Sequence, residues 1–210
     1  TKDSYRVKLK KIAIDKRMMK RILAIGIPSG IQHSIISLSN VIVQANINGY
    51  GSAAMAGYGA YSKIDGFVML PLQSFCIAAT TFTGQNIGAE KKKRVKQGIV
   101  QGIVISAVYT LALSPLLLWK AEDLIQIFSS DPEVLRYGKM TISMLIPFYG
   151  VLSIHQILMG TFRGAGKTMV TMLIGIGNMC VLRMIYINGM VPFFPSYEAV
   201  MLCYPITWTT

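Results

Sequence analysis

The chain has 210 residues, of which 52% are hydrophobic and only 14% are charged, and its mean hydropathy is +0.48. A soluble domain of this size would carry roughly a quarter charged residues, so the composition argues against a soluble enzyme. The formal net charge is nevertheless +12. Such an excess is typical of proteins that contact nucleic acid or an anionic membrane surface, and the placement of the basic residues decides between these.

Long apolar segments follow one another along the chain. A helix that crosses the hydrocarbon core needs about 20 mostly apolar residues, and none of these segments alternates as the strands of a membrane barrel do. The fold class is therefore all-α, a polytopic bundle of transmembrane helices. Both ends look cut, so we expect a piece of a longer protein. The predicted spans are 22–47, 53–85, 97–119, 140–162, 168–191 and a truncated sixth, 199–210.

Basic residues gather at every second connection between these spans. Sixteen of the 21 Lys and Arg residues lie before the first span, between the second and third, or between the fourth and fifth. The opposite connections are bare or slightly acidic. Such alternation predicts that the basic side faces the cytoplasm, so the net charge reports topology and not a nucleic-acid partner.

Two shorter segments have amphipathic patterns. Residues 8–21 mix apolar and basic positions at helical spacing, which predicts a basic cytoplasmic segment, residues 1–21, with a helix on an anionic leaflet. The alternative is a solvated linker. Residues 122–130 predict a short amphipathic helix on the outer face. The domain division is therefore 1–21 and a membrane-embedded part, 22–210, which the resemblance described below makes a transporter lobe.

Polar side chains at membrane depth are costly and usually face a cavity or another helix. On the first span they form one stripe, with Gln32 beside it, and a similar stripe occurs on the fourth span. We interpret both as lining a wet surface, with hydrogen bonding between helices as the alternative. The candidates for the substrate cavity are Gln32, His33, Ser37, Asn40, Gln44, Tyr149, Ser153 and Gln156, and the stripes also include Ser29 and Gly160.

Charged and titratable groups inside the spans are candidates for gating or proton transfer. Lys63 and Asp65 are two residues apart and therefore lie on different faces of their helix, so each needs its own partner, in this chain or in a missing part. Arg183 poses the same question, and His155 is a candidate proton relay or a packing residue. Prolines within four spans predict kinks of the kind that occur where a bundle rocks around a central site: Pro28, Pro71, Pro115 and Pro147.

Nothing in the sequence indicates bond-making chemistry. Residues 164–168 (Gly-Ala-Gly-Lys-Thr) resemble a phosphate-binding loop. That motif requires a glycine five residues before Gly166, but the residue there is Thr161, and no strand precedes the segment. No catalytic triad, carboxylate pair or metal cluster has usable spacing. We expect no enzyme activity, no metal site and no cofactor beyond a coupling ion.

Four stretches resemble the multidrug and toxic compound extrusion (MATE) family: 26–30 (Gly-Ile-Pro-Ser-Gly), 53–66, 84–89 (Gly-Gln-Asn-Ile-Gly-Ala) and 160–168. They occur in the family's order over nearly the whole chain and match its carboxy-terminal lobe. The motif residues assigned to cytoplasmic loops are Gly84, Gln85, Asn86, Gly88, Ala89, Arg94, Arg163, Gly164 and Gly166.

The resemblance implies a transporter of about twelve helices in two lobes, of which this chain supplies the second. It implies a cavity between the lobes, from which organic cations are exported across the cytoplasmic membrane, in bacteria, in exchange for sodium ions or protons. The partners would be the bilayer, the amino-terminal lobe and a small, cationic substrate. Some branches carry carboxylates where this chain has Ile36 and Ser153. We therefore expect the coupling carboxylate in the amino-terminal lobe.

Two other functions compete with an antiporter. A lipid-linked oligosaccharide flippase of the same superfamily would need a strongly basic cavity, whereas the stripes are neutral, and only Lys63 and Arg183 favour it. A non-transporting membrane scaffold would need neither buried charges nor a wet stripe.

Overall fold

The computed structural model describes residues 15–209 as helices joined by short loops, with no β-strand among those residues. The π-helical segment η3 and the 3-10 segment η2 interrupt the α-helices. In chain order the elements are α1 (Lys16–Asn48), α2 (Ser52–Gly88), α3 (Lys92–Trp119), α4 (Ala121–Gln126), α5 (Pro132–Leu145), η2 (Ile146–Phe148), α6 (Tyr149–Gly164), α7 (Thr168–Ile176), η3 (Gly177–Leu182), α8 (Arg183–Gly189), α9 (Tyr197–Met201) and α10 (Cys203–Thr209).

Several helices begin where the sequence carries a capping residue. The Asp15 carboxylate accepts hydrogen bonds from the backbone N–H groups of Arg17 and Met18, at 2.7 and 3.2 Å. Asp131 caps α5 in the same way, and Pro132 occupies its first turn, where no N–H is needed. These caps satisfy backbone donors that the first turn of a helix leaves without partners.

Five stretches of the described chain are long and apolar enough to cross a membrane: Lys16–Asn48, Ser52–Gly88, Lys92–Trp119, Pro132–Gly164 and Thr168–Gly189. Their outward faces carry large apolar side chains, and Phe67 and Leu111 are 76% and 71% exposed. Contiguous exposure of this kind is unfavourable in water and natural in lipid. The chain is therefore an integral membrane protein.

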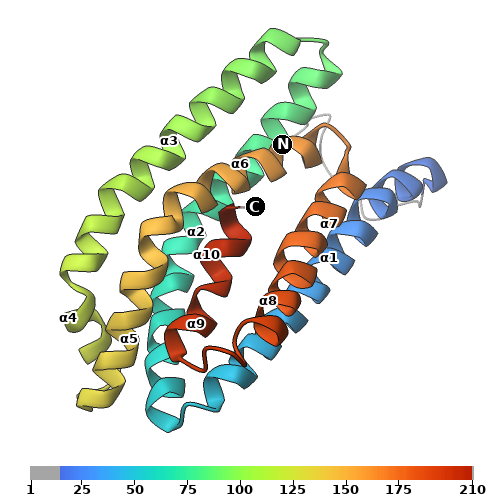
Figure 1. Cartoon of the computed structure of the whole chain (residues 1–210). Coiled ribbons are helices and arrows are strands. Elements are labelled where there is room, and N and C mark those ends of the chain that lie inside the picture. Colours follow the sequence, from blue (N-terminus) through green and yellow to red (C-terminus); the bar gives the residue numbers. More distant parts are fainter. Residues whose placement is uncertain (1–14, 210) are drawn as a thin grey trace, which may run out of the picture.

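The helices form two groups (Figure 1). Helix α2 packs against α5 and α6, and α3 covers α2 and α6 from the outside, whereas α1 runs beside α7 and α8. The short α9 and α10 lie between the two groups, where α10 contacts both α6 and α8. A side-chain hydrogen bond joins α1 to η3 within the second group, since the Ser39 hydroxyl donates to the carbonyl of Met179 at 2.8 Å.

The structure departs from the predicted spans in three places. The expected helix 140–162 begins at Pro132 and is broken by η2, because Pro147 cannot supply an N–H to the helical ladder. The expected helix 168–191 contains η3, which has no counterpart in the apolar pattern. The expected sixth helix is two short helices, α9 and α10, on either side of Leu202.

The amphipathic segments also differ from expectation. Residues 16–21 continue α1 without a break, so a separate interfacial helix over that part of 8–21 is wrong; residues 8–14 lie outside the described part. The prediction of a short helix over 122–130 is right in kind, but the helix α4 ends at Gln126, and the chain then turns toward Asp131.

Candidate transport site

The polar face of α1 is open on this lobe. His33, Ser37 and Asn40 are exposed, and Ser29 and Gln44 are half-buried. The buried face of the helix is a different one, which contains Pro28, Gln32, Ser39, Val43 and Ile47. Exposed polar groups along the length of a membrane-spanning helix need water or another protein surface, because lipid offers them no hydrogen bonds.

Gln32 does not belong to this open face, which corrects its assignment to the cavity. Its side chain is only 3% exposed and lies between helices. The Arg163 guanidinium donates from Nη2 to Gln32 Oε1 at 3.3 Å and contacts the Cys76 sulfur at 4.0 Å. Gln32 therefore joins α1 to the end of α6, and positions one residue apart on a helix need not share a surface.

The polar face of α6 is packed inside the lobe. Tyr149 and Ser153 are 1% and 0% exposed, and the Ser153 hydroxyl donates to the Gly150 carbonyl at 2.8 Å. A Cβ at Gly160 would overlap the Cys76 carbonyl of α2. The expectation that this face lines a wet surface is wrong within the lobe, because the backbone of α2 packs directly against the backbone of α6 at Gly160. Gln156 is half-buried.

Asp65 has its partners within this chain. The hydroxyl of Tyr149, the first residue of α6, donates to Asp65 Oδ1, and the Tyr61 hydroxyl donates to the same oxygen at 3.4 Å. The two tyrosine oxygens are 3.0 Å apart. Lys63 is exposed on another face of α2, as its spacing from Asp65 requires. Asp65 thus ties α2 to the point where the fourth span is broken.

Arg183 is the largest fully buried side chain, at 2% exposure. Its Nη1 donates to Asn40 Oδ1 at 2.7 Å, its Nη2 donates to Thr207 Oγ1 at 3.3 Å, and its Cζ lies 4.6 Å from the centre of the Tyr204 ring. The Nε atom has no hydrogen-bond partner. The guanidinium therefore holds α1, α8 and α10 together through neutral groups.

Tyrosines connect the half-buried carboxylate of Asp65 to the buried guanidinium of Arg183. The hydroxyl oxygens of Tyr58 and Tyr204 are 2.6 Å apart, and the rings of Tyr58 and Tyr61 are 5.9 Å apart. We call the whole set the tyrosine network; its members are Asp65, Tyr61, Tyr149, Tyr58, Tyr204, Arg183 and Asn40. It runs from a carboxylate between α2 and α6 to a guanidinium whose acceptor, Asn40, lies on the open face of α1.

Sequence reasoning missed the three tyrosines Tyr58, Tyr61 and Tyr204, together with Thr207. A signal was present for two of them. Tyr58, Tyr61 and Asp65 are separated by three and four residues, so they share one face of a helix. The contribution of α10 had no comparable signal, because its contact with α2 and α8 depends on how the chain folds back after residue 196.

The cytoplasmic motif residues meet at one end of the lobe. A Cβ on Gly84 would lie 3.3 Å from the Gly164 carbonyl, so the ends of α2 and α6 touch there. Asn86 is buried and donates to the Phe82 carbonyl at 2.8 Å, whereas Gln85, Gly88, Ala89 and Arg94 are exposed. Gly166 has φ +77°, the left-handed conformation that suits a tight turn between two helices.

His155 is half-buried on α6, and its Nδ1 has no hydrogen-bond partner. Within residues 15–209, no group of three His, Cys, Asp or Glu side chains is placed to hold a metal ion. The fold and the polar groups together define a lobe of a polytopic membrane protein, with an open polar face on α1 and the tyrosine network inside the lobe.

Comparison with known proteins identifies the family. The sequence model of the MatE family matches residues 28–187, which is most of the chain, and the chain belongs to this family. Curated relatives include the probable multidrug resistance proteins YoeA of Bacillus subtilis, 28% identical over 75% of this chain, and NorM of Thermotoga maritima, 28% identical over 83%. An FAD transporter of Shewanella oneidensis is 25% identical over 86%.

Solved structures agree on the fold. A multidrug resistance MATE family transporter in an outward-facing conformation matches 97% of this chain with a TM-score of 0.86 at 16% identity. A transporter of the MOP superfamily from Pyrococcus furiosus, described by the reversed polarity of its binding pocket, matches 90% with a TM-score of 0.81 at 16% identity. The chain spans only 34%, 38% and 40% of the three curated relatives and 46% and 42% of these two structures.

Proposed function

We propose that this chain is the second lobe of an antiporter that exports organic cations or drugs across the cytoplasmic membrane in exchange for sodium ions or protons. The open polar face of α1, with His33, Ser37 and Asn40 exposed, is the observation that carries the proposal. A spanning helix with such a face is stable only where the face borders a water-filled cavity or another lobe. The names of several relatives, which describe multidrug resistance or export, support a drug-like substrate.

The open face carries neutral polar groups, and the carboxylate of this lobe is engaged elsewhere. Asp65 is held by two tyrosine hydroxyls inside the α2–α6 contact and does not lie on α1. We therefore place the coupling carboxylate in the amino-terminal lobe. In this arrangement the present lobe supplies one wall of the cavity, while the other lobe binds the ion.

A flippase fits the structure less well. Such a protein needs free cationic groups on the cavity wall to hold pyrophosphate, and Arg183 and Lys63 were the two candidates for them. Arg183 is instead buried and donates to Asn40 and Thr207 while it covers the Tyr204 ring. Lys63 is exposed, but it lies on α2 and not on the open face of α1.

The test uses the full-length protein in proteoliposomes, with efflux of a fluorescent organic cation under an imposed proton or sodium gradient. We expect one of the two gradients to drive flux. The double variant His33→Ala, Ser37→Ala should lower flux severalfold, while its thermal unfolding midpoint stays that of the wild type, because neither side chain packs inside the lobe. Flux that ignores both gradients, or that is unchanged in the double variant, would contradict the proposal.

A further inference from the structure

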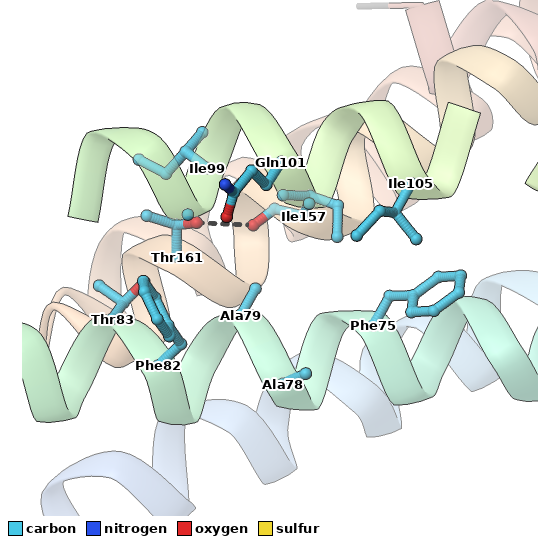
Figure 2. Close-up of a pocket in the computed structure, with 12 residues that line it drawn as sticks. Phe75, Ala78, Ala79, Phe82, Thr83, Ile99, Gln101, Ile105, Ile157 and Thr161 are labelled. Atoms are coloured by element: carbon cyan, nitrogen blue, oxygen red, sulfur yellow. Dashed lines mark hydrogen bonds between the residues drawn. The ribbon is translucent and has the colours of Figure 1, made fainter. Parts of the chain in front are cut away.

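A groove on the outer side of the lobe is separate from the open face of α1. It lies between α2 and α3, with α6 at its floor, and has a volume of about 230 Å³ (Figure 2). Figure 1 shows α3 at the opposite side of the lobe from α1. The residues that line the groove are mostly apolar: Phe75, Ala78, Ala79, Phe82, Thr83, Gly98, Ile99, Gln101, Gly102, Ile105, Ile157 and Thr161.

Small residues create this groove. Ala78 and Ala79 on α2 and Gly98 and Gly102 on α3 line the groove with little or no side chain. A Cβ on Gly98 would overlap the Phe82 ring, and one on Gly102 would lie 3.3 Å from Ile157. Figure 2 shows Phe75 and Phe82, both on α2, toward the two ends of the groove, with Ala78 and Ala79 between them. The result is a groove along the helices whose lining is mostly apolar, which suits a hydrocarbon chain.

Three polar side chains line this apolar space, Thr83, Gln101 and Thr161, and the amide of Gln101 is the largest of these polar groups. Gln101 is exposed on α3, and in Figure 2 it points into the groove toward Thr161 and Ile157. The Thr161 hydroxyl already donates its hydrogen to the Ile157 carbonyl at 2.9 Å. The amide N–H groups of Gln101 are donors at membrane depth, and an exposed amide there is costly without an acceptor. An ester carbonyl would provide one.

The cytoplasmic end of the groove is strongly basic. The first turns of α3 and the residue before it carry five exposed cations, and the three ion pairs among the described residues involve none of them. A shallow hollow lined by Lys96, Gln97, Val100 and Gln101 shares Gln101 with the groove and so connects it to this basic cluster. The basic cluster consists of Lys91, Lys92, Lys93, Arg94 and Lys96.

From its cytoplasmic end inward, the groove presents first the basic cluster, then the amide of Gln101, and then the apolar lining. A phospholipid has the same order of groups: phosphate, ester and acyl chain. We propose that this groove is a binding site for an anionic phospholipid of the cytoplasmic leaflet. The headgroup lies at the basic cluster, an ester carbonyl accepts from Gln101, and one acyl chain lies between Phe82 and Phe75. The same cations repel an organic cation, so the groove is not an entry for the proposed substrates.

The test uses the full-length protein, delipidated in neutral detergent, and counts bound lipid by native mass spectrometry during titration with phosphatidylglycerol or phosphatidylcholine. We expect the wild type to bind one phosphatidylglycerol about tenfold more tightly than phosphatidylcholine, since the basic cluster attracts the net negative charge that phosphatidylglycerol has and phosphatidylcholine lacks. The double variant Arg94→Gln, Lys96→Gln should lose this preference. The control Lys167→Gln, on the same side of the membrane, should keep it.

A second pair of variants tests the apolar lining of the groove. Ala78→Phe places a ring in the groove, and Ile105→Trp does so from α3; both positions are exposed, so neither change enters the packed interior. Each variant should lose the tightly bound lipid, whereas Val104→Phe, exposed on α3 but outside the groove, should retain it. Thermal unfolding midpoints in lipid-free detergent identify any variant that is misfolded.

Three results would overturn the proposal. One is equal affinity for the two lipids, and another is tight binding that persists in both Ala78→Phe and Ile105→Trp. The third is a different occupant of the groove. If the protein binds tetraphenylphosphonium and Ala78→Phe abolishes that binding, the groove is a substrate site. If the protein is a dimer and Ala78→Phe dissociates it, the groove is an interface between copies of the chain.

Discussion

The polar residues of α1 and α6 have similar spacing in the sequence, but in the structure those of α1 are exposed and those of α6 are buried. On α1 the residues His33, Ser37 and Asn40 remain exposed, while on α6 the residues Tyr149 and Ser153 are buried against α2. Periodicity shows that a helix has a polar face, but it does not show what covers that face. What separates the two is the neighbouring helix: α7 packs on the other side of α1, whereas α2 packs directly on the polar side of α6.

The largest expected effect concerns the close contact that buries the α6 face. Gly160→Ala would place a methyl group in the Cys76 carbonyl, and overpacking of this kind costs about 3 kcal/mol of unfolding free energy. Gly150→Ala, on the same helix with nothing within 4 Å, should be neutral or slightly stabilising. Thermal unfolding of the full-length protein in detergent measures both. Equal midpoints for the two variants would mean that α2 and α6 can separate freely.

The next effect concerns the hydrogen bond between Tyr149, on the buried face of α6, and Asp65 of α2. Tyr149→Phe removes the closer of the two donors to Asp65, and hydrogen bonds to charged groups contribute about 1.5–3 kcal/mol. Tyr186→Phe on α8 is the matched control, because that half-buried tyrosine makes no side-chain hydrogen bond with the residues described. A wild-type midpoint in Tyr149→Phe would show that the Tyr61 hydroxyl alone satisfies the carboxylate.

A smaller loss of unfolding free energy is expected at the hydrogen bond between Asn40, on the open face of α1, and the buried Arg183. Asn40→Ala removes one acceptor from Arg183, which keeps Thr207 and the Tyr204 ring, so we expect a loss of about 1.5 kcal/mol. His33→Ala on the same face should change unfolding by less than about 0.5 kcal/mol. If the two variants unfold alike, Arg183 does not depend on the open face.

The smallest effect compares two serines on one helix. Ser39→Ala removes a buried hydroxyl that donates to Met179 and should cost about 1 kcal/mol, while Ser37→Ala removes an exposed one and should cost almost nothing. Chemical denaturation in mild detergent resolves such a difference. A reversed order would mean that the exposed face of α1 is the one that stabilises the lobe.

Much of the fold followed from local patterns. The apolar runs predicted five of the spans to within a few residues at most ends, and the caps at Asp131 and Pro132 are visible in the sequence. The start of the fourth span at Pro132 was missed because residues 132–139 are polar enough to resemble a loop. The π-helical segment η3 was missed because the apolar pattern does not distinguish it from an α-helix.

The site was less predictable. Spacing placed Lys63 and Asp65 on different faces, and the structure agrees, but it could not name the partners of Asp65 or Arg183. Asp65 and Tyr149 are 84 residues apart, and Asn40 and Arg183 are 143 apart. Contacts at such separations depend on which helices become neighbours, and a single sequence carries no direct record of that.

By itself the sequence determined that this is a membrane protein of apolar helices with polar and charged groups at membrane depth, and it predicts that the basic side faces the cytoplasm. These properties depend on the transfer of residues between water and lipid, which composition and spacing capture. Only the tertiary structure decided which polar face is open, which is buried, and that a carboxylate and a guanidinium end one network of tyrosines. Burial and pairing depend on the packing of helices that are distant in the chain, and small residues such as Gly160 determine how closely those helices approach.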